Sequence, residues 1–424
     1  MRKLGIYVHI PFCVRKCRYC DFLSFPAAEE TQWIYVRALQ REIEWESGRK
    51  SIAADGIKKT EKAGKTFQDT GFIVDTVFIG GGTPSVLPEG ALEEILDCLR
   101  QCNRFPACRE PEITVEVNPG TVDRKKLESY RKAGVNRISI GTQSVHGQEL
   151  AYLGRVHSAA DFFRTYRDTV EAGFTNINVD IMAALPGQSV TDYMDNLSQV
   201  AGLYPAHISA YSLIIEEGTP FYDLYGEERR SQESCGTENG SILPLPSEDE
   251  EREMYERTDA FLREKGYRRY EISNYAMPGR ECRHNKGYWT RQDYVGFGLG
   301  AASMVGNVRW KNRTSMDEYL RLAGTEGAGV KQEIHRLDKR EQMEEFMFLG
   351  LRLTEGVGRR EFWQTFGVDV EEVYGAVLGK MRAQGLLETD GRIRLTDYGR
   401  DVSNYVMAEF LLDTAAGISY HKDI

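Results

Sequence analysis

Hydrophobic and polar positions follow two alternating patterns through the first half of the chain. Six short runs rich in Val, Ile and aromatic residues are bounded by Gly, Pro or polar residues, which is typical of buried strands. They cover residues 5–10, 76–81, 113–118, 137–144, 176–185 and 207–214. The segments between them carry apolar residues at three- and four-residue spacing, which predicts helices. These helices cover residues 31–47, 89–102, 123–133, 158–172 and 189–203.

This repeated alternation predicts an α/β fold with a parallel sheet and right-handed crossovers. Six strand–helix units fit either a doubly wound sheet or a partial β/α barrel, and the pattern alone does not choose between them. In both architectures the chemistry is expected at the carboxyl ends of the strands. The sequence therefore directs attention to the residues that follow each strand.

The pattern changes in the second half, and it predicts three regions, covering residues 1–225, 226–329 and 330–424. Two polar stretches, about 48–70 and 227–249, are expected to be surface insertions because they cannot bury a core. Residues 342–353, 359–366 and 370–383 have helical patterns, and Asp390-Gly391 marks a hairpin turn. A mainly helical C-terminal domain with a winged-helix-like module is therefore predicted.

Composition narrows the range of partners and compartments. The net charge is −10, so a chain-wide basic field for nucleic acid is absent. No run approaches 18 apolar residues, so we expect membrane contact only through a partner. The chain has eight cysteines and begins without a signal-peptide pattern, which indicates a reducing, cytoplasmic location rather than a disulfide scaffold.

Three of the cysteines, Cys13, Cys17 and Cys20, form a C-x3-C-x2-C motif directly after the first strand. Three thiolates on one loop suit three irons of a cubane cluster, which would leave the fourth iron open to substrate or cofactor. A zinc site and unrelated structural cysteines are the alternatives. Zinc requires a fourth ligand nearby.

Polar or glycine residues also follow the other predicted strands. Gly80-Gly81-Gly82-Thr83 ends the second strand, and glycines let the backbone approach a ligand closely. The strands after it end in polar side chains, and Arg155 follows the fourth as a potential bidentate partner of a carboxylate. These side chains are Glu116, Gln143 and Asp180. Their shared location at strand ends predicts one composite site.

The cysteine motif after a first strand resembles the radical S-adenosylmethionine (SAM) superfamily, and the resemblance implies a partial (β/α)6 barrel with a [4Fe–4S] cluster. In that family the open iron chelates the amino and carboxylate groups of SAM. The whole chain is similar to the coproporphyrinogen III oxidase-like branch. The resemblance then implies SAM contacts from Tyr7, Tyr19, Gly81, Gly82, Thr83, Glu116, Gln143, Arg155, Asp180 and, more weakly, Ile214.

Two functions occur in this branch. One is oxygen-independent coproporphyrinogen III oxidase, which decarboxylates propionates to vinyl groups and carries a further cysteine two residues after the third. Here Phe22 holds that position, and the first strand begins by residue 5 without a long extension. Both features favour the other subgroup, the heme chaperones, which bind heme and pass it to apo-proteins of respiration. An electron donor for the cluster is also implied.

The segment His284-Asn285-Lys286-Gly287-Tyr288-Trp289 reads H-N-x-x-Y-W, which is similar to a motif of the heme-chaperone subgroup. An imidazole beside two aromatics suits a flat macrocycle, with His284 as an axial ligand. A core histidine packed on aromatics is the alternative. Other heme-ligand candidates stay open; they are His9, His146, His157, His207 and Cys282.

Overall fold

The computed structural model describes residues 2–48, 71–103, 105, 110–226, 242–325 and 329–412. Both polar insertions fall mainly on residues outside these ranges. The predicted parallel strands are confirmed, with ends within a few residues of the expected ones. They are β1 (Arg2–Ile10), β2 (Phe72–Gly81), β3 (Glu112–Val117), β4 (Arg137–Gln143), β5 (Ile177–Ala183) and β6 (His207–Ser212).

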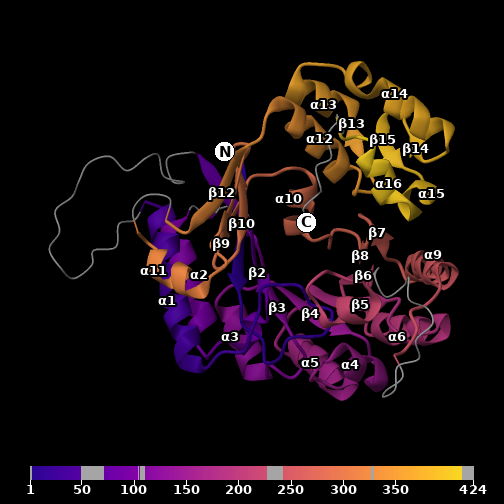
Figure 1. Ribbon diagram of the computed structural model, residues 1–424. Coiled ribbons are helices and arrows are strands. Elements are labelled where there is room, and N and C mark those ends of the chain that lie inside the picture. The colour runs from indigo at the N-terminus through magenta and orange to yellow at the C-terminus, as the bar shows by residue number, and fades with distance from the viewer. Residues whose placement is uncertain are drawn as a thin grey trace.

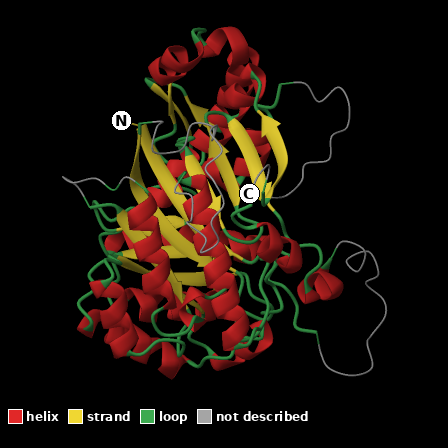
Figure 2. Ribbon diagram, turned by 90° about the vertical axis from the view of Figure 1, so that its left-hand side faces the viewer, coloured by secondary structure: helices red, strands yellow, loops and turns green. Residues whose placement is uncertain are grey.

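The helices between these strands cover the sheet. They are α1 (Glu29–Glu46), α2 (Ala91–Cys102), α3 (Arg124–Lys132), α4 (Gly147–Leu153), α5 (Ala159–Glu171) and α6 (Val190–Ala201). Figure 2 shows the long helices crossing in front of the strands. Only α4 was not predicted, because its seven residues give too short a period to recognise.

Strand order decides between the two architectures that the sequence left open. Strands β1 to β6 lie side by side in chain order, and each pairs in parallel with the next. A doubly wound sheet would reverse direction at a switch point. The sheet is therefore a partial β/α barrel, and it does not close.

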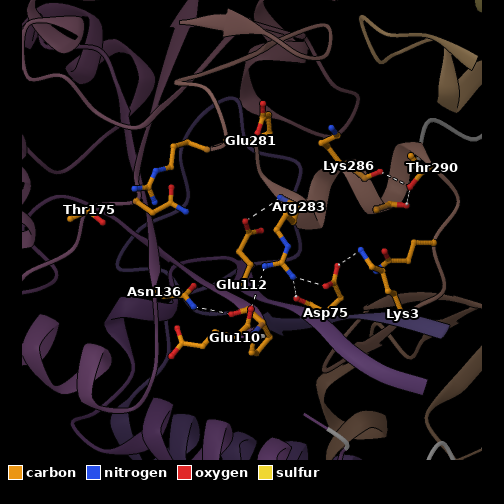
Figure 3. Close-up of a pocket in the computed structure, with 16 residues that line it drawn as sticks. Lys3, Asp75, Glu110, Glu112, Asn136, Thr175, Glu281, Arg283, Lys286 and Thr290 are labelled. Atoms are coloured by element: carbon orange, nitrogen blue, oxygen red, sulfur yellow. Dashed lines mark hydrogen bonds and ion pairs between the residues drawn. The ribbon is translucent and has the colours of Figure 1, made fainter. Parts of the chain in front are cut away.

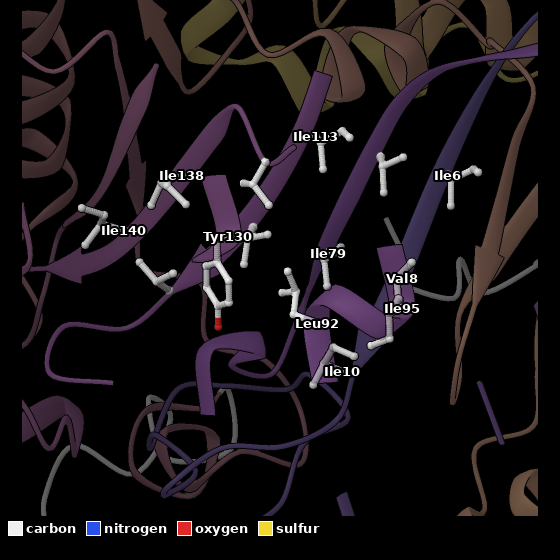
Figure 4. Packing of buried hydrophobic residues seen from close by; sticks show 14 of the residues in the cluster. Ile6, Val8, Ile10, Ile79, Leu92, Ile95, Ile113, Tyr130, Ile138 and Ile140 are labelled. Carbon is white, nitrogen blue, oxygen red and sulfur yellow. The ribbon is translucent and has the colours of Figure 1, made fainter. Parts of the chain in front are cut away.

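Alternation along the strands separates an apolar outer layer from a polar interior. In β2, Val77 and Ile79 are fully buried against the helices, whereas Thr76 faces inward. Figure 4 shows the outer layer, in which Ile79 of β2 lies beside Leu92 of α2. Strand burial on the outer face thus leaves the inner face for polar chemistry.

The predicted connecting region supplies further strands to both edges of the same sheet, and residues 331–336, at the start of the predicted C-terminal region, supply the last of them. Across the described residues this sheet has twelve strands in the order β12-β11-β10-β9-β1-β2-β3-β4-β5-β6-β8-β7. The added strands are β7 (Arg268–Arg269), β8 (Asn274–Ala276), β9 (Tyr294–Phe297), β10 (Ala302–Val305), β11 (Val308–Asn312) and β12 (Lys331–Arg336). Helix α7 (Pro220–Tyr225) closes the predicted barrel region, and the connecting region contains α9 (Glu248–Glu264), α10 (Arg283–Trp289) and α11 (Met316–Leu322).

A second hydrophobic core lies in the C-terminal part, at the upper right of Figure 1. Helices α12 (Lys339–Gly350), α13 (Arg359–Phe366) and α14 (Val370–Ala383) precede a hairpin of β14 (Leu387–Glu388) and β15 (Arg392–Leu395). Strand β13 (Val357–Gly358) completes a three-stranded sheet, and α15 (Asp397–Asp401) and α16 (Ser403–Ala408) follow. This is the predicted mainly helical domain with its winged-helix-like hairpin. No helix in the described ranges is long and apolar enough to cross a membrane.

Candidate functional site

The three motif cysteines line one cavity at the carboxyl ends of the strands. Its volume is about 150 Å3. The loop that carries the cysteines runs from β1 to α1 and is held by backbone hydrogen bonds at several points. Cys13 N–H donates to Phe25 O at 3.2 Å, and Arg18 N–H donates to Leu153 O at 3.0 Å. The loop is therefore fixed against the barrel rather than free to move.

Each sulfur has a distinct environment. Cys13 Sγ lies 3.4 Å from Thr83 Oγ1, and Arg155 Nη1 donates to Cys17 Sγ at 3.8 Å. Burial raises the pKa of the Cys20 thiol to about 11, so a cluster would have to displace its proton. Within the described ranges no three His, Cys, Asp or Glu side chains meet around one metal ion. All three cysteines line the same cavity.

The glycine triplet brings the backbone of β2 against the cysteine loop. Gly82 N–H donates to Ile10 O at 2.8 Å, and Thr83 N–H donates to Phe12 O at 2.7 Å. A Cβ on Gly82 would lie 2.7 Å from both of these carbonyl oxygens. Gly81 has a φ of +103°, and a Cβ there would lie 2.3 Å from His9 Nδ1. These glycines are therefore required by the close approach of two chain segments.

Two carboxyl groups face the cavity, Glu116 from β3 and Asp180 from β5, with β4 between the two strands. Gly81 N–H donates to Glu116 Oε2 at 3.1 Å, and Asn178 Nδ2 donates to Asp180 Oδ1 at 2.7 Å. Burial, and then the charge of Asp180, raise the pKa of Glu116 to about 7. Burial also raises the pKa of Asp180. Such a carboxyl pair favours a ligand that brings positive charge.

Arg155 and Gln143 each present a buried polar atom that has no partner. Arg155 Nη2 donates to Asn118 Oδ1 at 2.9 Å and also to Gly141 O, which fixes the guanidinium. Its Nε and the Oε1 of Gln143 are buried without a hydrogen bond. Gln143 is held at a φ of +61°, a conformation that non-glycine residues seldom adopt. Unpaired buried polar atoms beside a cavity indicate a missing ligand.

The structure brings most of the predicted site residues to this one cavity. Its lining includes Cys13, Cys17, Tyr19, Cys20, Gly81, Gly82, Thr83, Glu116, Gln143, Arg155 and Asp180. Tyr7 lies behind Gly81, with its hydroxyl 3.0 Å from His9 Nδ1. Ile214 follows the end of β6, is 67% exposed and does not line the cavity. The residue roles remain predictions.

Sequence reasoning did not assign several further residues of the lining to the site, among them Asn118, Ser139 and Tyr211. Asn118 joins the site by binding two others, because its Nδ2 donates to Thr83 Oγ1 at 2.8 Å while its oxygen accepts from Arg155. Strand alternation offered a signal for the other two. Ser139 lies two residues before Gly141 on β4, so both lie on the inward face. Tyr211 lies two residues after Ser209, which is the partner of Asp180 on β6.

His284 lies elsewhere, on α10 beneath the amino-terminal half of β2. It is 3% exposed, and Thr76 Oγ1 and Tyr288 OH lie 2.8 Å from its Nδ1 and Nε2. Its ring stacks on Phe78, and burial lowers its pKa to about 3. This arrangement is that of a core histidine packed on aromatic residues, which was the alternative to an axial heme ligand. Ligation of heme iron would require one of these two hydrogen bonds to be replaced.

A second cavity, of about 620 Å3, lies beside α10 at the amino ends of the strands (Figure 3). Arg283 lines this cavity, and its Nη2 donates to Asp75 Oδ1 at 2.5 Å, while its backbone N–H donates to Glu112 Oε2 at 3.1 Å. Figure 3 shows these charges turned toward one another. Mutual pairing of this kind fastens α10 to β2 and β3.

The fold and the cysteine-lined cavity define a radical SAM protein. Residues 7–200 match the Radical SAM superfamily, and residues 337–402 match the HemN C-terminal domain. The structure is similar to that of the radical SAM enzyme coproporphyrinogen III oxidase from Escherichia coli, with a TM-score of 0.78. That likeness covers 97% of this chain and 90% of the other at 22% identity, so it shows the fold.

Curated relatives identify the family within this class. The chain is 34% identical to the heme chaperone HemW of Bacillus subtilis over 96% of this chain and 98% of the relative. It is also 34% identical to the heme chaperone HemW of Escherichia coli, over 97% and 98% of the two chains. The chain belongs to the HemW family. As a radical SAM family, it implies a [4Fe–4S] cluster and SAM as cofactors.

Proposed function

We propose that this protein is a heme chaperone, which carries a [4Fe–4S] cluster and SAM and passes heme to apo-hemoproteins such as respiratory cytochromes. The main support is that the chain is 34% identical to curated heme chaperones along nearly its whole length. That identity runs through the barrel, α10 and the C-terminal domain together. A shared barrel alone would support only the shared cofactor chemistry.

The donor set of the cavity fits the two cofactors. Cys13, Cys17 and Cys20 would hold three irons and leave the fourth to the amino and carboxylate groups of SAM. When bound, the reduced cluster supplies the electron that cleaves the SAM sulfonium. The hydrogen-bonded loop would hold the three thiols at one cavity.

The residues around the cysteines would hold SAM by charge and hydrogen bonding. Glu116 would accept from the SAM amino group, and the Nε of Arg155, which is buried without a hydrogen bond, would donate to its carboxylate. Asp180 suits the ribose diol. Gly81 and Gly82 leave room for the methionine portion because they carry no side chain.

The second candidate function is oxygen-independent coproporphyrinogen III oxidase. It is favoured by the likeness of the whole fold to that enzyme. Phe22, in place of the further cysteine expected of the oxidases, and the closer identity to heme chaperones favour the first candidate.

One anaerobic experiment separates the two. Reconstituted protein is incubated with heme, and in parallel with coproporphyrinogen III, SAM and a reductant. The chaperone assignment predicts retained heme that passes to an apo-cytochrome, and no protoporphyrinogen. Production of protoporphyrinogen, or no retention of heme, would overturn it.

A further inference from the structure

A fully buried histidine lies one layer deeper in the barrel than the cysteine-lined cavity. His207 begins β6 and lies opposite Asn178 in the parallel pairing of β5 with β6. Asp180 follows two residues later on β5, so strand alternation puts it on the same inward face as Asn178. Asp180 lines the cavity, whereas Asn178 and His207 lie outside its lining. His207 therefore acts on a ligand of the cavity only through its neighbours.

Asn178 connects the histidine to the carboxyl group of Asp180. Its Nδ2 donates to Asp180 Oδ1 and to Ser139 Oγ, both at 2.7 Å. Its Oδ1 lies 2.6 Å from His207 Nδ1. The reverse orientation of the amide would place its oxygen against the carboxylate, where two acceptors repel each other. The amide therefore has one favourable orientation, and that orientation requires a proton on His207 Nδ1.

Burial and a second partner keep this proton in place. Tyr270 OH lies 2.9 Å from His207 Nε2, so a ring protonated at Nδ1 accepts there from the phenol. Burial, and then the charge of Arg137, lower the pKa of His207 well below its usual value, so the ring is neutral and carries one N–H. Both ring nitrogens are thus used in hydrogen bonds within the barrel.

The serine hydroxyls around Asn178 do not replace the imidazole as a fixed donor. Ser209 Oγ donates to Asn178 Oδ1 at the longer distance of 3.2 Å. A serine hydroxyl rotates to suit its partners, whereas the direction of the imidazole N–H is set by the ring. Loss of His207 would therefore free the Asn178 amide to turn, and Asp180 would lose its short hydrogen bond from that amide.

We propose that His207 is a positioning residue for SAM, which fixes Asp180 through Asn178 so that the carboxylate meets the ribose hydroxyls. This inference rests on the proposed function, in which Asp180 binds the ribose. Ser139 Oγ also donates to Asp180 Oδ2, at 3.4 Å. An ionised carboxylate has about four lone-pair sites, so Asp180 keeps acceptor capacity for two ribose hydroxyls.

The test measures the Kd of SAM for the anaerobic, cluster-loaded full chain by calorimetry, without a reductant. Two amide substitutions form a matched pair, because His207→Asn keeps an N–H near the place of Nδ1 and His207→Gln moves it to the place of Nε2. His207→Gln should raise the Kd about tenfold, and His207→Asn should stay within about threefold of wild type. Asn178→Ala removes the connecting amide and should match His207→Gln.

A SAM analogue that lacks both ribose hydroxyls separates positioning from a general structural loss. It has no hydroxyl for Asp180, so its Kd should be the same in wild type and His207→Gln. Tyr193→Phe is the control for stability, because it removes a buried hydrogen bond to Thr258 at 2.8 Å between α6 and α9. It should lower the thermal unfolding temperature and leave both Kd values unchanged.

A double-variant cycle tests whether His207 acts through Asp180. Asp180→Ala should raise the Kd for SAM, and adding His207→Gln should cause no further loss, since both changes affect one carboxylate. Additive losses, an equal loss for the analogue, or normal SAM binding by both His207→Gln and Asn178→Ala would overturn the proposal. Wild type that binds no SAM would instead refute the cofactor of the proposed function. Heme retention is measured separately, so a failure to bind heme leaves this result distinct.

Discussion

At the scale of single residues, the cavity gathers groups that destabilise the protein without a ligand. The carboxyl of Glu116 is buried near that of Asp180, and the polar atoms of Arg155 and Gln143 lack partners. Each of these costs free energy in the empty protein. A cationic, hydrogen-bonding ligand such as SAM would relieve several of them together.

Glu116→Gln should remove the free-energy cost of a buried, ionised carboxylate, and its effect on stability should therefore depend on pH. The folded-state pKa of Glu116 is raised to about 7 from 4.5, so the folded state binds the proton more tightly. Its contribution to the free energy of unfolding therefore falls as the pH rises from about 4.5 to 7. The cluster-free variant should match wild type near pH 5 and be more stable by roughly 1–3 kcal/mol at pH 8. Urea unfolding at both pH values measures this, and a difference independent of pH would refute it.

Gly82→Ala should displace the cysteine loop, because its Cβ would meet Ile10 O and Phe12 O at 2.7 Å. We expect a loss of about 1–3 kcal/mol in the free energy of unfolding and a lower iron content after reconstitution. Gly147→Ala is the control, since a Cβ there meets no atom within 4 Å. Thermal unfolding and iron analysis test the pair, and normal iron in Gly82→Ala would contradict the role given to this contact.

The residues that sequence reasoning found are those whose chemistry is tied to a motif or a strand end. The cysteines, Gly81, Gly82 and Glu116 are of this kind, and they line one cavity. Asn118 lies two residues after Glu116, so strand alternation puts it on the same face, but its contacts to Thr83 and Arg155 depend on tertiary structure and could not be read from the sequence. His284 illustrates the opposite case. Its motif was visible and includes one hydrogen-bond partner, Tyr288, on the same helix, whereas its other partner, Thr76 of β2, depends on tertiary packing.

At the scale of elements, α10 joins the barrel to the C-terminal domain. On one side His284 binds Thr76 of β2, and on the other Arg352 lies 4.3 Å from the ring centroid of Trp289. Just beyond α10, Arg291 Nε donates to Glu345 Oε2 of α12 at 3.0 Å. The H-N-x-x-Y-W segment is therefore packed between two parts of the molecule.

Glu345→Ala should loosen this junction. Glu345 is buried and also pairs with Arg309 of β11 at 2.9 Å, so its removal leaves the nearly buried Arg291 without its counter-charge. The expected loss is about 3 kcal/mol in the free energy of unfolding. Glu318→Ala, which removes an exposed partner of Arg313 at 3.9 Å, should cost less than about 1 kcal/mol. Denaturant melts of both variants decide this, and equal losses would show that the junction carries no special weight.

Elements were predictable where their periodicity was long. Strands β1 to β6 and most of their helices were found, whereas β7 to β12 have two to six residues and were missed. Helix α9 was also missed, although it is long and Ser247 and Glu250 form a capping box that marks its start. Its acidic first turn continues the polar insertion before it, and composition concealed this signal.

At the scale of the whole molecule, one chain supplies a partial barrel, whose strands carry the cysteine-lined cavity at their carboxyl ends, and a mainly helical C-terminal domain, at the upper right of Figure 1. The order of the parallel strands was not readable from periodicity, since a partial barrel and a doubly wound sheet share the same alternation. The outer strands β9 to β12 and β7 to β8 come from distant sequence and extend both edges of that sheet. Strand pairings between segments so far apart in the sequence depend on tertiary packing, so local sequence patterns do not predict them.

The most direct test is iron, sulfide, zinc and heme analysis of the anaerobically reconstituted full-length chain. We predict about four iron and four sulfide per chain, and about one heme retained after exposure to excess heme. Cys17→Ser should lose most of the iron and the absorbance near about 400 nm. Stoichiometric zinc in place of iron, full iron in Cys17→Ser, or no retained heme would contradict the account.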